Sequence, residues 1–178
     1  FEVLDRRTQP YAARMLAQAN FIILCGGHVP TENRFFHDIH LRKALQKFDG
    51  VLLTISAGSM NAAERVYSSP EYDGESIDPH YPLHMQGLGL THVNILPHYQ
   101  QLRYAKVDGK RLVYDIVAGH SFEHPVYCLP DGSYFLITPE RTELRGLAYK
   151  MHCGKVRRIC QDDERKLLTP GGRLVAVK

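Results

Sequence analysis

The stretch that decides the fold runs from Val51 to Asn61 and reads VLLTISAGSMN. Its first five residues are β-branched or apolar and predict a buried strand. Residues 56–58 (SAG) then form a short turn, and a helical pattern follows from Ser59 to Val66. A serine at such a turn has its hydroxyl exposed at the end of the sheet, above helix N–H groups that lack a partner. This arrangement is called a nucleophile elbow, and here Thr54 stands where the common form has glycine.

Helices and strands alternate on both sides of this stretch. A helical face follows Thr8 and ends at Asn20, and Phe21–Cys25 is an apolar run expected to form a strand covered on both faces. A second helix is expected from about Thr31 to Phe48, before the strand at Val51. The alternation predicts a three-layer α/β/α fold of the flavodoxin-like type, with a mostly parallel sheet.

The rest of the chain adds strands and a long loop. Residues 68–89 are rich in Pro, Gly, Asp, Ser, Tyr and His without any period, which predicts a loop that gates the site. Strands are expected at His92–Leu96 and Val126–Leu129, each stopped by a proline, with a short helix after Gly109.

The C-terminal part is predicted to be an antiparallel meander that forms a small edge of the sheet. Its expected strands are Ser133–Thr138, Glu143–Lys150 and Lys155–Cys160. A charged surface piece, Gln161–Lys166, precedes the last apolar run, Leu174–Val177.

Length and composition narrow the class of protein. A chain of 178 residues is expected to form one domain, residues 1–178. The net charge of +3 is small, and the basic residues of the chain are scattered. Both observations argue against nucleic-acid binding. No apolar run approaches the ~20 residues that span a bilayer. The four cysteines form no C-x-x-C pair, which favours a reducing, cytoplasmic location in which Cys25 and Cys128 pack as small hydrophobic residues.

Residues of catalytic type stand where four predicted strands end. These are the Gly26–Gly27 pair, Ser56, His98 and Asp131. In open parallel sheets, ligands bind outside the carboxyl ends of the strands, so we expect these residues to meet. A serine needs a base to take its proton, and a histidine needs a carboxylate to fix its tautomer. Backbone N–H groups of the glycine pair and of Ala57 would stabilise the oxyanion.

Four motifs carry a resemblance to a known family. They are CGGHVPT (25–31), ISAGSMN (55–61), ILPHYQ (95–100) and LPDGSYF (129–135). With these motifs, the sequence resembles the peptidase E (aspartyl dipeptidase) and cyanophycinase family of serine peptidases, whose fold is similar to class I glutamine amidotransferases. The resemblance covers about residues 8–160. Family members normally carry one or two further strand–helix units before this point, so the resemblance implies that the chain lacks its first units.

The resemblance also assigns roles. It implies that Ser56 is the nucleophile, His98 the base and Asp131 the third triad member, with an oxyanion hole from the Gly27 and Ala57 backbones. The implied reaction is hydrolysis of a short, aspartyl peptide through an acyl-enzyme, without a cofactor. The expected partner of the chain is thus a small peptide substrate. Whether the chain forms a homodimer is left open by the sequence. Residues weighed for substrate binding are Gly26, His28, Ser59, Tyr99, Gln100 and Arg111, with Arg103 and Lys110 as further basic candidates.

Several alternatives remain at this point. Asp115 and Glu71 are rivals of Asp131 for the third triad position, and Asp131 in P-D-G could be only a turn former. His37/His40 and His120/His124 are spaced as metal-ligand pairs, but neither pair has a third ligand, so no metal is expected. The chain could also be a non-catalytic binding domain, or an amidase or other acyl-transfer enzyme on the same scaffold.

Overall fold

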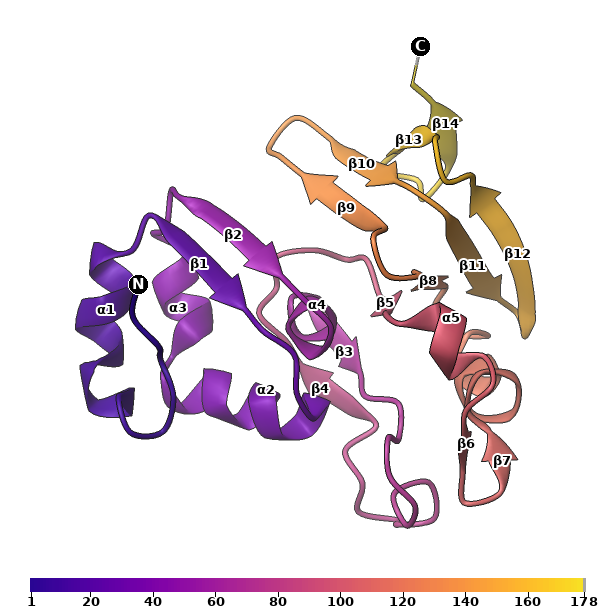
Figure 1. Ribbon diagram of the computed structural model, residues 1–178, viewed down its shortest axis with the longest axis horizontal. Helices are drawn as coiled ribbons and strands as arrows, with labels where there is room; N and C mark the ends of the chain where they lie inside the picture. Colours follow the sequence, from indigo (N-terminus) through magenta and orange to yellow (C-terminus); the bar gives the residue numbers. More distant parts are fainter. Residues whose placement is uncertain (178) are drawn as a thin grey trace. The chain divides into compact units, whose positions relative to one another are not determined.

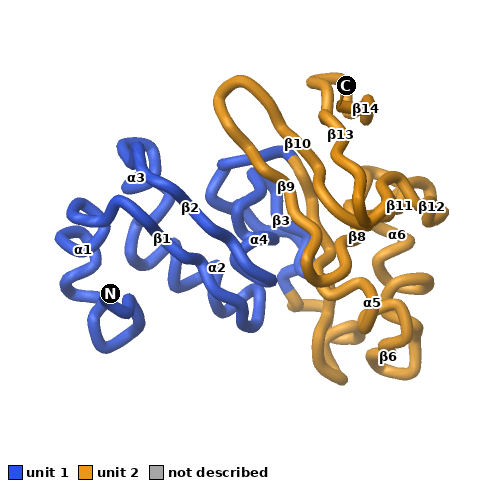
Figure 2. The backbone as a smooth tube through the Cα atoms, turned by 45° about the horizontal axis from the view of Figure 1, so that its top comes forward, with its two compact units in different colours: residues 1–68, 82–92 blue, residues 69–81, 93–178 orange. Residues whose placement is uncertain are grey.

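The computed structural model describes residues 1–177 (Figure 1). Its chain divides into two compact units (Figure 2). Unit 1 comprises residues 1–68 and 82–92, and unit 2 comprises residues 69–81 and those from 93 onward. Each unit has its own strands and its own core, so each is described by itself.

Unit 1 alternates helices and strands as the sequence predicts. Its elements in order are a short 3₁₀ turn η1 (Gln9–Tyr11), α1 (Ala12–Gln18), β1 (Phe21–Leu24), α2 (Val29–Asp38), α3 (Leu41–Leu45), β2 (Val51–Thr54), α4 (Ala57–Asn61), β3 (Arg65–Tyr67) and β4 (His84–Gln86). β1 and β2 lie side by side and run in parallel (Figure 1). Their register places Leu24 opposite Thr54. β3 and β4 pair antiparallel.

The sheet of β1 and β2 has one covered face and one bare face. Leu24 is buried in a cluster with residues of α1, α2 and α3, and Ile22 and Leu52 pack against that cluster. On the other face, Val51 is 64% exposed and Phe21 is 50% exposed. The expectation that the 21–25 strand is covered on both faces is therefore wrong.

The helix expected over residues 31–48 is two helices. His40, between α2 and α3, has φ 53° and lies in the left-handed region, which an α-helix cannot contain. The break re-aims the chain so that Phe36 before it and Leu41 after it both join the same core cluster. No glycine or proline marks this break in the sequence, which is why periodicity alone misses it.

The helix expected over residues 59–66 is also shorter than predicted. α4 ends at Asn61, because the backbone carbonyls of residues 61–64 accept hydrogen bonds from the N–H groups of residues 87–90 instead of from the next helical turn. The N–H groups of Leu88 and Leu90, for example, donate to the carbonyls of Asn61 and Ala62 at 2.8 and 2.9 Å. The predicted 68–89 loop therefore contains a strand, β4, which pairs with β3.

Unit 2 is dominated by strands. Its elements in order are β5 (Ile95–Leu96), α5 (Tyr99–Leu102), β6 (Lys106–Val107), β7 (Lys110–Arg111), a π-helical segment η2 (Leu112–Val117), α6 (Ala118–His120), β8 (Val126–Cys128), β9 (Tyr134–Ile137), β10 (Thr142–Arg145), β11 (Ala148–His152), β12 (Lys155–Cys160), β13 (Arg165–Leu168) and β14 (Leu174–Ala176). One sheet has the order β12-β11-β8-β5 and another has the order β14-β13-β10-β9. β5 and β8 pair in parallel, whereas the other neighbours in these two sheets are antiparallel.

The predicted antiparallel C-terminal strands are confirmed, but their division differs. The single strand expected over residues 143–150 is split at Gly146, which has φ 84°, so β10 and β11 join different sheets. Residues 165–166, expected in a charged surface piece, begin β13. The structure thus confirms a mixed α/β fold with small mixed sheets.

Glu143 is an acidic residue buried in unit 2. Its side chain on β10 is 1% exposed, and its carboxylate lies 2.9 Å from Nε of Arg145, 3.5 Å from Arg141 and 3.9 Å from Arg165. The hydrogen bond from Arg145 lowers the pKa of the Glu143 carboxyl, and the charges of Arg145, Arg141 and Arg165 act in the same direction. A carboxylate among several arginines stays ionised despite its burial.

We expect Glu143→Gln to lower the melting temperature at pH 7, because it leaves the arginines without their carboxylate. A carboxyl with a lowered pKa in the folded state stabilises the fold above its unfolded pKa of about 4.3, and this stabilisation is lost as the pH falls through the folded pKa. The gap in melting temperature between wild type and variant should therefore narrow as the pH falls below about 4. Asp162→Asn, at an exposed carboxylate, is the control and should change little; an equal gap at every pH would contradict the prediction.

Candidate active site

Ser56 occupies a strained turn between β2 and α4. Its backbone has φ 54° and ψ −120°, a combination that lies outside the left-handed helical well. Non-glycine residues held in such sparsely populated regions cost about 1–3 kcal/mol each and gather at functional sites. A strand, a sharp strained turn at serine and a helix together make the nucleophile elbow that the sequence predicts.

Two glycines allow the backbone to pass close to this turn. A Cβ on Gly58 would lie 2.4 Å from the carbonyl oxygen of Leu24, and the Gly58 N–H donates to the Cys25 carbonyl at 3.1 Å. A Cβ on Gly26 would lie 2.8 Å from Cβ of Ser56. The loop after β1 therefore presses directly on the serine, which explains the glycines at both positions. Gly58 was missed as a site residue, although its place after Ser-Ala was the signal.

Thr54 is accommodated at the elbow without strain. It is the last residue of β2 and does not have a positive φ, so the backbone does not require the glycine common at this position. Its Oγ1 accepts a hydrogen bond from Oγ of Ser59 at 3.1 Å. Ser59, weighed for substrate binding, thus ties the first turn of α4 to the end of β2.

Backbone donors adjoin the serine in the same unit. Ala57 is the first residue of α4, where helix N–H groups have no partner within the helix. Gly27 lies one residue beyond the contact of Gly26 with Ser56, and a Cβ on it would meet nothing within 4 Å. His28 follows as the N-terminal flank of α2, with Nδ1 2.8 Å from Oγ1 of Thr31. The Gly27 backbone is therefore open to approach, whereas the His28 ring is engaged with its own helix.

His98 and Asp131 are brought together in unit 2. Nδ1 of His98 lies 2.7 Å from Oδ1 of Asp131, and their side chains are 39% and 54% exposed. His98 directly precedes α5 with φ 53°, and Asp131 lies in the turn after β8, where Gly132 has φ 91°. A histidine whose Nδ1 faces a carboxylate has its other ring nitrogen, Nε2, directed elsewhere for proton transfer.

The two rival acidic residues, Asp115 and Glu71, lie in other surroundings than Asp131. Asp115 binds Arg111, with Oδ1 2.6 Å from the guanidinium, and it also accepts the backbone N–H of Arg111 at 2.8 Å. The hydrogen bond from Arg111 lowers the pKa of Asp115 to about 2. Arg111, weighed for substrate binding, is thus engaged by Asp115. Glu71 lies in the 69–81 segment, where its N–H donates to the carboxylate of Glu75.

Tyr99 and Gln100, both weighed for substrate binding, have different surroundings. Tyr99 is 2% exposed and its ring packs against Tyr149 at 4.9 Å between centroids, so it is a core residue. Its burial raises the pKa of the hydroxyl. The Gln100 carboxamide binds Asp131, with Nε2 2.6 Å from Oδ2. The sequence does not reveal this contact, because it depends on the orientation of the Gln100 side chain.

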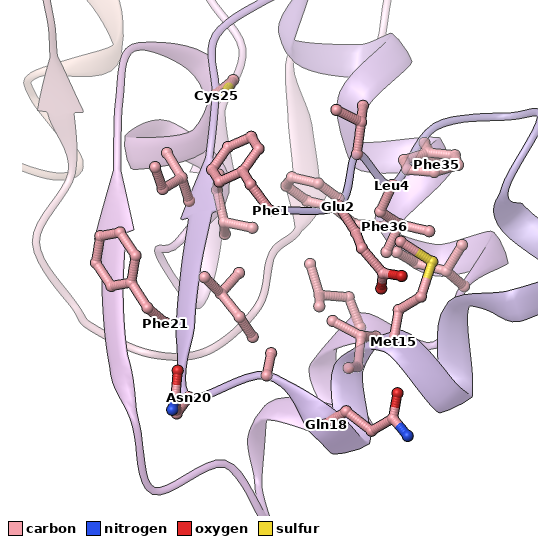
Figure 3. Close-up of a pocket in the computed structure, with 18 of the residues that line it drawn as sticks. Phe1, Glu2, Leu4, Met15, Gln18, Asn20, Phe21, Cys25, Phe35 and Phe36 are labelled. Carbon is pink, nitrogen blue, oxygen red and sulfur yellow. The ribbon is translucent and has the colours of Figure 1, made fainter.

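An apolar hollow of about 620 Å³ lies in unit 1 against β1 (Figure 3). Its walls come from residues 1–4, α1, β1 and α2, and include Phe1, Met15 and Phe35. Ser56 does not line it. Cys25 does line it and is exposed, so the expectation that Cys25 packs inside a strand is wrong: β1 ends one residue earlier. Cys128, by contrast, is buried in β8, and burial raises its pKa to about 12.

The described residues contain neither a metal-binding cluster nor a helix that could span a membrane. Within residues 1–177, no group of three or more His, Cys, Asp or Glu side chains is arranged to hold a metal ion. His37, from one of the predicted pairs, has Nε2 3.1 Å from the carbonyl oxygen of Gln86. Over the same residues, no helix has both the length and the apolar character to cross a bilayer.

Comparison with protein families decides the identity. The model of peptidase family S51 matches residues 2–145, which include the elbow, His98 and Asp131. The chain belongs to peptidase family S51. The predicted resemblance is thereby confirmed, and so, at the level of the family, is the expectation of a peptidase. No curated protein matches the chain.

Solved structures of peptidases share the fold of this S51 chain. A peptidase from an acI-B1 Actinobacterium has a TM-score of 0.57 at 14% identity, over 98% of this chain and 67% of that one. A putative peptidase E protein from Listeria monocytogenes EGD-e has a TM-score of 0.52 at 12% identity, over 84% of this chain and 65% of that one. The S51 chain thus spans about two thirds of the length of each.

We expect Gly26→Ala to destabilise the S51 chain by about 1–3 kcal/mol, because its Cβ would overlap Cβ of Ser56 and force the elbow to shift. Gly27→Ala is the matched control in the same loop and should be nearly neutral, since its Cβ would enter open space. Urea unfolding of both variants measures the difference. Equal stabilities would show that the elbow yields to the added methyl group at no cost.

Proposed function

We propose that this chain is a serine peptidase in which Ser56 attacks the carbonyl carbon of a peptide bond. His98 takes the serine proton and passes it to the leaving amine, and Asp131 orients His98. The acyl group stays on Ser56 until water, activated by His98, releases it. The observation that carries the proposal is the backbone of Ser56, held at φ 54° and ψ −120° at the end of β2.

The strain at Ser56 favours a nucleophile over a plain turn residue. Serine has no conformational preference for this region, and a glycine would adopt it with less strain. A serine at a backbone conformation that suits glycine is explained if its hydroxyl group has a function at that position. The 2.7 Å contact of His98 with Asp131 supports the other half of the proposal, since it gives the imidazole a carboxylate partner at Nδ1.

Backbone N–H groups of Gly27 and Ala57 are proposed to stabilise the oxyanion. Support comes from their position: Gly26 touches Ser56, Gly27 follows it, and Ala57 begins α4. Losing one oxyanion donor typically lowers turnover by ~100- to 1,000-fold. Both donors belong to the main chain, so side-chain substitutions leave them in place.

The proposed substrate is a short peptide, with N-terminal aspartyl dipeptides as the first candidates. The segment expected to limit access is anchored rather than loose: Asp108 accepts hydrogen bonds from the N–H groups of Gly74 and Ser76 and from the Ser76 hydroxyl. Among the basic candidates, Arg103 stacks over the rings of Tyr99 and Tyr104, with its guanidinium carbon 5.7 and 5.0 Å from the ring centroids.

An assay that compares the hydrolysis of dipeptides with that of free amides separates a peptidase from an amidase.

Three further parts of the proposal concern the chain as a whole. We propose one hydrolase domain over residues 1–178, with a three-layer flavodoxin-like arrangement. We also propose a cytoplasmic location, which the unpaired state of all four cysteines supports.

Ser56→Ala should abolish peptide hydrolysis, by roughly 10⁶-fold in kcat, and should also abolish labelling by a fluorophosphonate probe. The fold should be retained, as circular dichroism would show. Ser59→Ala is the matched control, because this neighbouring serine is bonded to Thr54, and it should still be labelled. Labelling that persists in Ser56→Ala would overturn the proposal; an unlabelled wild type would favour a binding domain.

His98→Ala and Asp131→Asn should slow the labelling of Ser56 to different extents. Loss of the base removes the proton acceptor, whereas Asp131→Asn leaves the imidazole present but in the wrong tautomer, with a loss of about 10⁴-fold in kcat. Asp115→Asn is the control at the rival carboxylate and should leave the labelling rate unchanged. A loss in Asp115→Asn as large as in Asp131→Asn would reassign the acid.

A further inference from the structure

The Gln100 side chain closes a ring of hydrogen bonds with Asp131. Nε2 of Gln100 donates to Oδ2 of Asp131 at 2.6 Å, and the backbone N–H of Asp131 donates to Oε1 of Gln100 at 3.1 Å. A backbone N–H can only donate, so the atom facing it must be the carbonyl oxygen of the carboxamide. This fixes the orientation of the amide, and its NH₂ group therefore faces the carboxylate.

The ring leaves one carboxylate oxygen for the histidine. Oδ2 of Asp131 is bound by Gln100, and Oδ1 lies 2.7 Å from Nδ1 of His98. The main chain supports the same arrangement, because the N–H of Tyr99 donates to the carbonyl of Leu129 at 3.1 Å. Three successive residues at the start of α5 are thus bonded to the segment that carries Asp131.

Exposure of Asp131 makes such support necessary. Its side chain is 54% exposed, so neighbouring atoms restrict its rotation less than they would restrict a buried triad carboxylate. A carboxylate in that setting points at a histidine only if hydrogen bonds hold it there. An amide suits this role, since it offers a donor to the carboxylate and an acceptor to the N–H at once.

We propose that Gln100 is a positioning residue for Asp131, holding the carboxylate toward Nδ1 of His98. The proposal deepens the proposed function, because it assigns a second group to the His98–Asp131 pair. Gln100 acts through Asp131 and is not assigned a contact with substrate. Its removal should free the carboxylate to rotate, and His98 should then lose the acceptor that fixes its tautomer.

The test is nitrogen-15 NMR of the His98 ring in the full chain at neutral pH. The signals are assigned by their absence in His98→Ala. In the wild type, the proton should reside on Nδ1, facing Asp131. Gln100→Met, which keeps the length of the side chain but lacks the amide, should raise the share of the Nε2–H tautomer toward that of Asp131→Asn.

Gln101→Met is the matched control. It makes the same change in the same helix, at a neighbouring exposed glutamine, and should leave the His98 signals unchanged. His98 signals in Gln100→Met that match those of the wild type would overturn the proposal. Because this measurement needs no turnover, its result stands whether or not Ser56 reacts.

Labelling of Ser56 by a fluorophosphonate gives a second, separate result. Gln100→Met should slow it by up to roughly 100-fold, as expected for a displaced catalytic group, and Gln101→Met should not. In an Asp131→Asn background, adding Gln100→Met should cause no further loss, since Gln100 would act only through Asp131. A further loss there as large as in the wild-type background would overturn the positioning role, whereas absence of labelling in the wild type would count against the proposed function alone.

Discussion

The close passage of two backbones at the elbow is the constraint on which the candidate site depends. The loop after β1 runs so near to residues 56–58 that glycine is needed at positions 26 and 58. Hydrogen bonds from the N–H of Ile55 to the Leu24 carbonyl and from Gly58 to Cys25 hold the two segments together. Parallel pairing of β1 with β2 sets this distance, and the strained backbone of Ser56 is its result. Packing of the sheet on α1–α3 thus supplies the free energy that keeps a serine in an unfavourable conformation.

The two halves of the candidate machinery are organised by different forces. Ser56 is held by steric confinement, and the next residue, Ala57, is buried in a core cluster of the same unit. His98 and Asp131 are half-exposed, and hydrogen bonds fix them instead. Confinement is insensitive to solvent, whereas hydrogen bonds between exposed groups compete with water at every moment. This difference explains why a polar neighbour such as Gln100 matters for the acid, while small residues matter for the nucleophile.

The sequence predicts local features well where turn residues mark them. The predicted bounds of the 155–160 strand agree with the structure, because Gly154 marks its start. The predicted turn at Ser56 agrees as well, because small residues form it. Prediction from the sequence fails where tertiary contacts override the local pattern. His40 breaks a helix without any helix-breaking residue, and α4 ends early because residues 87–90 use the carbonyls of its continuation. His98 and Asp131 could be paired from strand ends and motifs, but the contact of Gln100 depends on a side-chain orientation that spacing does not reveal.

The bare side of the β1–β2 sheet has a practical consequence. Phe21, Val51, Leu53 and Ile55 present aromatic and aliphatic groups there to water, without a charge among them. Soluble monomers seldom expose such a contiguous apolar patch, because it associates with other apolar surfaces. A purified sample of this polypeptide would therefore be expected to adsorb to plastic and to the air–water boundary through this side. A trace of mild detergent in the buffer would be a sensible precaution against such losses.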